Sequence, residues 1–139
     1  MATASATTGR LRCLVVTPEA TVLDTGATFV ALPLYDGELG VAYNHSPMIG
    51  RLGYGELRIT AGESKQRYYV DGGFVQVADN VVSVLTNRAI SADQVDSQTA
   101  ATQLAEALSR RPSGDEELMI RGRLVRQARA QLRVAGRRP

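Results

Sequence analysis

Residues 55–86 read "GELRITAGESKQRYYVDGGFVQVADNVVSVLT" and carry the most regular pattern of the chain. Apolar and polar residues alternate along it, so that Leu57 and Ile59 fall on one face while their neighbours fall on the other. A period of two residues is the pattern of a β-strand with one buried face. The Gly, Asp and Asn residues between the alternating runs favour tight turns. The stretch therefore predicts strands over 55–61, 65–71, 73–78 and 81–86, with turns at 62–64, 71–73 and 79–80.

The residues before this stretch follow the same plan. Short β-branched runs separated by Gly, Pro, Asn and Asp predict four more strands, over 11–17, 20–24, 27–33 and 39–43. Short strands in close succession are typical of an antiparallel sandwich or barrel, so we expect a β-sandwich domain over 10–90. Cys13, the only cysteine, alternates with Leu11 and Val15, which predicts a buried thiol. Residues 1–9, rich in Ala, Ser and Thr, are expected to form a disordered tail.

The period of the sequence becomes helical after residue 90. Residues 91–94 fit a capping box, and so do residues 113–116, which follow Pro112. We therefore expect two helices that form an antiparallel hairpin over 91–139. Their predicted apolar stripes are Ala101, Leu104, Ala105 and Leu108 in the first helix, and Leu118, Val125, Ala128 and Leu132, with Ala135 at the margin, in the second. Both stripes are thin, so we expect the hairpin to dock on the sandwich or on a partner.

Positive charge gathers in the C-terminal third. The chain has 139 residues with 16 Lys+Arg and 14 Asp+Glu, a net charge of +2. Residues 95–139 carry nine Arg and five acids (+4), whereas residues 1–94 carry seven basic and nine acidic residues (−2). This asymmetry indicates an acidic surface as partner, on a protein, a nucleic acid or lipid headgroups. No apolar run approaches the roughly 18 residues that would span a bilayer.

An arginine stripe stands out on the second predicted helix. A 100° wheel places Arg126, Arg129, Arg133 and Arg137 together, beside the apolar side. No acid follows Arg121, so these charges have no helical partner four residues away. Unpaired like charges repel along a helix, which favours an external acidic partner. Nucleic acid is the general alternative, although the stripe has no interleaved aromatics and no nucleic-acid module is recognisable.

The single histidine, His45, follows two acids, Asp36 and Glu38, in a segment bent by glycines. A histidine and a carboxylate can act as base and orienting group, so a small acid/base enzyme is one hypothesis. No nucleophile motif accompanies them, and one histidine falls short of the three or four ligands that a zinc site needs. The segment is better interpreted as an exposed loop that contacts a partner. The glycine-rich stretches lack the Lys-Ser/Thr of a phosphate-binding loop.

Four segments together resemble the epsilon subunit of F-type ATP synthases, whose mitochondrial equivalent is called delta. They are "GELGVAYNHSPMIGRLGYGELRI" (37–59), "YYVDGGFVQVADNVVSVLTNRAI" (68–90), "VDSQTA" (95–100) and "AQLRVA" (130–135). Their order, their spacing and the sequence of sandwich then hairpin all agree with that family. The resemblance covers roughly residues 10–136.

The resemblance implies a non-catalytic rotor subunit that belongs to the central stalk and reaches the membrane only through the complex. Its sandwich would bind the gamma subunit and the polar loops of the membrane-embedded c-ring. By the motif match, Glu38 would face the c-ring loops with Asp36 beside it, and His45 would lie close to gamma and the ring. The expected location is the cytoplasmic side of a bacterial inner membrane. Whether the translocated ion is H⁺ or Na⁺ is decided in the c-ring.

The resemblance also implies two positions for the helices. In bacterial and chloroplast members they fold onto the sandwich or extend along gamma to the catalytic alpha/beta head, where they oppose ATP hydrolysis. Arg126, Arg129, Arg133 and Arg137 would then meet an acidic loop of the beta subunit. Whether this chain inhibits hydrolysis is left open. A polyanion-binding protein that uses the same arginines is the alternative function.

One family motif is altered. Some bacterial members bind ATP through (Ile/Leu)-Asp-x-x-Arg-Ala in the first helix, and residues 95–100 match it at Asp96 and Ala100. Thr99 takes the place of the arginine, which removes a partner for phosphate charge. We therefore expect weak or no ATP binding and no cofactor.

Overall fold

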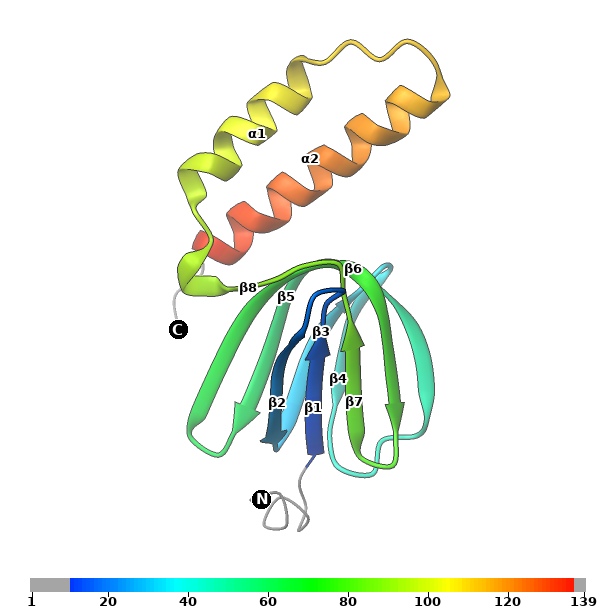
Figure 1. Ribbon diagram of the computed structural model, residues 1–139, viewed down its shortest axis with the longest axis vertical. Helices are drawn as coiled ribbons and strands as arrows, with labels where there is room; N and C mark the ends of the chain where they lie inside the picture. Colours follow the sequence, from blue (N-terminus) through cyan, green and yellow to red (C-terminus); the bar gives the residue numbers. More distant parts are fainter. Residues whose placement is uncertain (1–10, 137–139) are drawn as a thin grey trace.

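The computed structural model describes residues 11–136, and it has the expected plan of a β-sandwich followed by a helical hairpin (Figure 1). The expected tail at residues 1–9 and Arg137 lie outside the described residues. The strands are β1 (Leu11–Val16), β2 (Thr21–Ala27), β3 (Phe29–Leu34), β4 (Gly37–Val41), β5 (Met48–Ala61), β6 (Ser64–Ala78), β7 (Val81–Leu85) and β8 (Ala89–Ser91). The 3-10 helix η2 (Ala92–Gln94), α1 (Ser97–Ser109) and α2 (Asp115–Gly136) follow.

Two long strands, β5 and β6, build both layers of the sandwich. The strand order is β2-β1-β7-β6-β5-β3-β4, and β8 pairs with β6 off this path. β7 pairs with the last part of β6, over 74–78, whereas β8 pairs with residues 68–70. All of these pairings are antiparallel except that of β1 with β7. Because β5 and β6 pass from one layer to the other, the sheet closes over itself (Figure 1).

The passage between the layers is a bend centred on glycines. In β6, Tyr68 and Val70 pack in the sandwich core before the bend and Val75 and Val77 do so after it, so the inward face changes from even-numbered to odd-numbered residues. Gly73, at the bend, has φ +108°, and a Cβ there would lie 2.0 Å from the carbonyl oxygen of Leu85. Only glycine fits this backbone and this approach. The bend thus allows one continuous strand to serve both layers.

The core lies between the layers and is aliphatic. It contains Leu11, Cys13, Val15, Val30, Leu32, Val41, Leu57, Ile59, Val70, Val75, Val77, Val82 and Val84, none of them more than 2% exposed. The predicted alternation of Leu57 and Ile59 is confirmed, and so is the buried position of Cys13. Burial raises the pKa of the Cys13 thiol to about 12.

Several strand ends are shifted by one to three residues, and the structure corrects the predicted strands at three further points. The predicted turn at 71–73 is a bend inside β6, because pairing with β5 continues on both sides of it, at Asp71 and Gly73. β5 begins at Met48 instead of residue 55, so residues 48–54 also lie inside a strand. β8 was not predicted, because its three residues become a strand only by pairing with β6. In each case, pairing between distant segments outweighs local turn propensity.

The first helix begins later than predicted. Residues 92–94 form η2, and Ser91 makes no side-chain cap bond. The N-cap of α1 is Asp96, whose carboxylate accepts from the backbone N–H of Gln98. The second helix begins at Asp115, near its predicted start, but Ser113 bonds Glu117 instead of Glu116.

The predicted helix stripes are only partly correct. Leu108 and Leu118 are 44% and 53% exposed, and the buried residues of α1 are Ala100 and Ala107. On α2, Val125 and Ala128 are buried as predicted, but so are Ala130, Gln131 and Val134. The reason is that α2 lies between α1 and the sandwich, so its buried surface is wider than one stripe (Figure 1). The hairpin is docked on the sandwich in this structure.

Candidate functional site

The hairpin meets the sandwich through a small apolar cluster. Tyr69 of β6 packs with Ala92 of η2 and with Ala130 and Val134 of α2. Tyr69 is the one large fully buried side chain of the cluster, and the partly buried Tyr54, Ile90 and Val95 pack against it. The helix α2 itself contributes only the small side chains of Ala130 and Val134, whose burial gives a modest docking free energy. The apolar part of this junction is therefore weak enough to be separated.

Polar bonds add to the junction around Asp71. This carboxylate is 9% exposed and accepts from the Tyr69 hydroxyl at 2.9 Å and from Gln127 Nε2 at 2.9 Å. Arg88 Nε lies 3.9 Å from its other oxygen. Burial, together with the Asp71 charge, raises the pKa of Tyr69 above its ordinary value, so this hydroxyl remains a donor. Asp71 thus joins β6 to α2.

A second polar connection runs from the tip of β4 to the end of α2. Glu38 pairs with Arg58, and Arg58 also pairs with the buried Glu56. Arg67 binds Glu56 and donates to the carbonyl oxygen of Val134 at 2.9 Å. The Glu38 hydrogen bond is the first cause, and Glu56 a further one, of a raised pKa at Arg58. A chain of charged and polar contacts therefore connects Glu38 of β4 with the end of α2.

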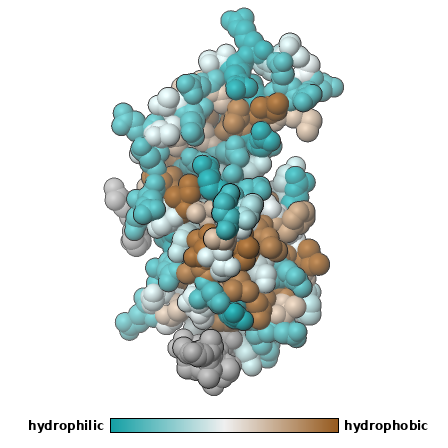
Figure 2. All heavy atoms as spheres, in the orientation of Figure 1, coloured by the Kyte–Doolittle hydropathy of each residue, from teal (hydrophilic) through white to brown (hydrophobic). Residues whose placement is uncertain are grey.

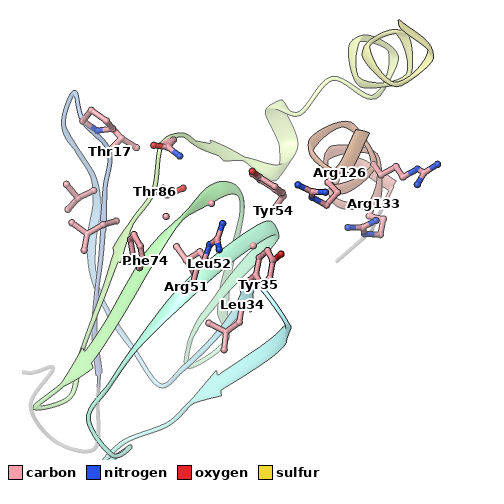
Figure 3. A pocket seen from close by; sticks show the side chains of 18 residues that line it. Thr17, Leu34, Tyr35, Arg51, Leu52, Tyr54, Phe74, Thr86, Arg126 and Arg133 are labelled. Carbon is pink, nitrogen blue, oxygen red and sulfur yellow. The ribbon is translucent and has the colours of Figure 1, made fainter. Parts of the chain in front are cut away.

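Three of the four predicted stripe arginines line one cleft. Arg126, Arg129 and Arg133 form its helical wall, and Arg51 lies on the sheet side. Arg126 and Arg133 project from α2 towards Tyr54 and Tyr35 (Figure 3). The cleft has a volume of about 1120 Å³, and no carboxylate of the described residues lines it. None of these four arginines forms an ion pair with a carboxylate of the described residues.

The structure separates His45 from the two acids. Asp36 and Glu38 are exposed at the start of β4, beside the hairpin end of the sandwich, where Glu38 lines a small hollow with Arg133 and Val134. His45 follows the other end of β4, next to Asn44, whose N–H donates to Asn80 Oδ1 in the β6–β7 turn at 2.6 Å. Its Nδ1 lies 2.7 Å from the Ser46 carbonyl oxygen. An acid/base pair is not assembled, and the described residues contain no group of three metal-binding side chains.

The residues that correspond to the nucleotide-binding motif, 95–100, include the N-cap and the first turn of α1. Asp96 Oδ2 accepts from the Thr99 hydroxyl at 2.7 Å, and Oδ1 accepts from the Gln98 N–H at 3.0 Å. The Thr99 bond is the first cause of a lowered Asp96 pKa. Ala100 is fully buried in α1, which packs against α2. Residues 96–100 therefore cap the N-terminus of α1 and help to pack it.

Several residues of these surfaces were not found from the sequence. They are Tyr35, Arg51, Arg67, Asp71, Phe74, Leu85 and Gln127. Only Phe74 could have been recognised from the sequence, because an aromatic residue on the polar side of an alternating strand indicates an exposed apolar surface. The contact between Asp71 and Gln127 spans 56 positions and leaves no local pattern.

Comparison with known proteins gives consistent matches. The family described as ATP synthase, Delta/Epsilon chain, beta-sandwich domain matches residues 10–92. The ATP synthase epsilon chain of Rhodopirellula baltica is 55% identical over 125 residues, which are 90% of this chain and 98% of that protein. The ATP synthase epsilon chain of Rubrobacter xylanophilus is 34% identical over 117 residues, 82% of this chain and 80% of that protein.

Solved structures agree with these matches. A chain of the Euglena gracilis mitochondrial ATP synthase, in a structure of OSCP, F1 and c-ring, superposes with a TM-score of 0.73 at 25% identity, covering 89% of this chain and 76% of that chain. A chain from the central stalk and c-ring of the Tetrahymena thermophila enzyme has a TM-score of 0.71 at 14% identity, over 90% and 96%, and shares the fold. Among the described residues, no helix has the length and apolar character needed to cross a membrane.

These matches give no support to the nucleic-acid alternative. They extend over the sandwich and the hairpin together, as the resemblance of the four sequence segments implied. This chain belongs to the ATP synthase delta/epsilon chain family.

Proposed function

We propose that this chain is the non-catalytic epsilon-type subunit of the central stalk of an F-type ATP synthase, where it couples rotation of the c-ring to the gamma subunit. The observation that carries the proposal is 55% identity to an ATP synthase epsilon chain over 90% of the chain, sandwich and hairpin included. The absence of an assembled acid/base pair around His45 is consistent with a binding role.

The two ends of the sandwich suit two contacts. Asp36 and Glu38 are exposed charged groups at one end, and we assign them to the polar loops of the c-ring. His45, half-buried at the other end, is assigned to the base of the rotor, close to gamma and the ring. Exposed charges such as Glu38 add more to the rate and orientation of docking than to its affinity. The sandwich over 10–90 is thus the coupling domain in this proposal.

The hairpin over 91–139 is the regulatory part of the proposal. Docked, it is held by the Tyr69 cluster and by the bonds of Gln127 and Arg67. Net contributions of about 0.5–1.5 kcal/mol per neutral hydrogen bond, and about 1.5–3 kcal/mol to charged groups, keep such docking reversible. Extended, α2 would bring Arg126, Arg129 and Arg133, and Arg137 beyond the described residues, to an acidic loop of the beta subunit. Inhibition of hydrolysis by these arginines should weaken as salt is raised.

Nucleotide binding by the hairpin is expected to be weak or absent. Asp96 is engaged by Thr99 and Gln98 as the N-cap of α1, and position 99 supplies no cation. The proposed location is the cytoplasmic face of a bacterial inner membrane, with attachment through the complex.

ATP hydrolysis by a reconstituted alpha/beta/gamma head tests the proposal. It is measured without this chain, with it, and with a version that ends at Val95, which retains β8 and η2. We expect both versions to bind gamma and only the full chain to slow hydrolysis. If neither version binds gamma or changes the rate, the rotor-subunit proposal is rejected.

A further inference from the structure

The second half of α2, residues 121–136, carries positive charge that its own sequence does not balance. It contains five arginines and no acid. Its apolar contact with the sandwich is small, because only Ala130 and Val134 take part in the cluster around Tyr69. Figure 2 shows that the surface of the hairpin is largely hydrophilic. Negative charge on the facing part of the sandwich therefore favours docking of this segment.

Two buried carboxylates of the strands lie next to this segment. Asp71, whose side chain is 12% exposed, accepts a hydrogen bond from Gln127 of α2. Glu56, whose side chain is 5% exposed, lines a small hollow together with Arg133 and Val134 of α2. Both carboxylates are enclosed by the chain, so a partner has little access to them while the hairpin is docked.

Glu38 is an exposed carboxylate beside the same segment. It lines that hollow with Glu56 and Arg133, and 55% of its side chain is exposed. Arg58 holds the Glu38 carboxylate through two contacts, of 3.1 and 3.2 Å, which keep the negative charge beside the hollow. A basic group from outside can therefore reach Glu38 while the hairpin is docked.

An external basic group and Arg133 have opposite effects at this carboxylate. Arg133 forms no ion pair with a carboxylate of the described residues, so Glu38 attracts it across the hollow. A cation that binds Glu38 offsets this negative charge and places a positive charge near Arg133. The docked helix then loses an attraction and gains a repulsion. Asp36, exposed two residues before Glu38, adds to the negative potential that draws such a cation.

We propose that the docked hairpin and a basic partner compete for Glu38, so that a partner's basic side chain bound there weakens the docking of α2. The inference rests on the proposed function for the origin of that side chain, a polar loop of the c-ring. The ring contact of Glu38 is part of the proposed function, and its opposition to hairpin docking goes beyond it. The coupling is reciprocal, because a docked hairpin lowers the affinity of Glu38 for the basic group by the same factor.

Thiol labelling of the full chain measures the docking. Val134→Cys places a thiol of similar size at a position that is 2% exposed in the docked state, so its labelling rate follows the undocked population. The native Cys13 is buried, and a chain without the new thiol gives the background. At about 0.1 M salt, Glu38→Gln should raise the rate about two- to fivefold. Glu38→Lys, which imitates the bound cation, should raise it further.

Two comparisons identify the interacting charges. Glu63→Gln removes the same charge from an exposed position in the turn between β5 and β6, and it should leave the labelling rate unchanged. In an Arg133→Gln chain, Glu38→Gln should have less than about half of its effect, as a double-mutant cycle requires of interacting residues. Unchanged rates in both Glu38 variants overturn the proposal, and so does an undiminished Glu38→Gln effect in the Arg133→Gln chain.

The c-ring is the probe for the partner. The labelling rate at position 134 is measured in the complex of the full chain with gamma, before and after the c-ring is added. The ring should raise the rate about two- to fivefold when Glu38 is present and leave it unchanged in Glu38→Gln. A ring that binds without raising the wild-type rate overturns the proposal. A chain that binds neither gamma nor the ring rejects the proposed function instead.

Discussion

Gln127 in α2 donates a hydrogen bond of 2.9 Å from its Nε2 to the Oδ1 of Asp71 in β6. The same oxygen accepts from the hydroxyl of Tyr69, the central residue of the apolar cluster under α2. Asp71 is also the last residue before the Gly72-Gly73 bend, and its backbone N–H donates to Thr86 Oγ1 at 3.0 Å. One residue, Asp71, therefore links the bend of the sheet and the strand end beyond β7, through its backbone, to the hairpin, through its carboxylate.

Replacing Gln127 by Ala should release the hairpin. Asp71 keeps its Tyr69 bond, so the sandwich stays folded, while α2 loses a bond to a charged acceptor of about 1.5–3 kcal/mol. The undocked population should rise roughly tenfold or more, seen as faster amide hydrogen exchange in α2. The control is Gln103→Ala, at an exposed position of α1, which should leave the exchange unchanged. Unchanged exchange in Gln127→Ala would show that the Gln127–Asp71 bond does not hold the hairpin in place.

Replacing Gly73 by Ala should unfold the sandwich. The new Cβ would meet the Leu85 carbonyl oxygen at 2.0 Å, and φ +108° is strained for any L side chain. The backbone of β7 cannot move without loss of the ladder, so we expect a cost of about 3 kcal/mol or more, or no folded protein. Gly136→Ala is the control, because a Cβ there meets nothing within 4 Å. Urea unfolding followed by circular dichroism measures both, and equal midpoints would disprove the steric explanation.

Replacing Arg67 by Met should destabilise the junction through Glu56. That carboxylate is 6% exposed and would keep only Arg58 as a charged partner among its described ion pairs. Loss of one partner of a buried pair costs about 3–5 kcal/mol, and the remaining arginine places the expected loss near the lower limit. The double variant R67M/E56Q should recover part of it, because no buried charge is left. Arg12→Met, which breaks the exposed pair with Asp24, is the control and should change the urea midpoint little.

The alternation of apolar and polar residues predicted the strands that face the core. This period of two belongs to the strand itself and does not depend on which strand it pairs with. Leu57, Ile59, Val75 and Val77 are buried as that period requires. The passage through Asp71-Gly72-Gly73 was predicted as a turn, because local propensity favours one there. The pairing of β5 with β6 keeps one register from Met48 to Ala61. These contacts between distant residues outweigh the local preference for a turn.

The candidate surfaces were predictable only where one element supplies all the residues. Helical spacing alone brought Arg126, Arg129 and Arg133 together. The floor of their cleft comes from three strands and needs the bend, which no local pattern encodes. The helix faces were mispredicted for a similar reason. Ala130 and Val134 are buried because Tyr69 lies beneath them, whereas Leu118 belongs to the part of α2 that extends past the sandwich (Figure 1).

Cys13 should make the stability of the protein fall at alkaline pH. Burial raises its pKa to about 12 in the folded chain, from about 8.5 when the chain is unfolded. The folded state thus binds this proton more tightly, so the contribution is complete below about pH 8.5 and is lost as the pH rises towards 12. At about pH 10.5 the loss from this thiol alone should be of order 2–3 kcal/mol, since each pH unit above the unfolded pKa costs about 1.4 kcal/mol. Urea unfolding between pH 7 and 10.5 measures it.

The variant Cys13→Ala separates this effect from that of Tyr69, whose pKa is also raised and whose titration lowers stability in the same direction. The variant is less stable at pH 7 because it leaves a small cavity, but its stability should decline less steeply with pH. The free energy of unfolding falls with pH at different slopes in the wild type and in Cys13→Ala only if the wild-type thiol stays protonated while the chain is folded. Parallel declines for the two proteins, or rapid modification of Cys13 by a thiol reagent in the folded protein at pH 9, would show that water reaches the interior of β1.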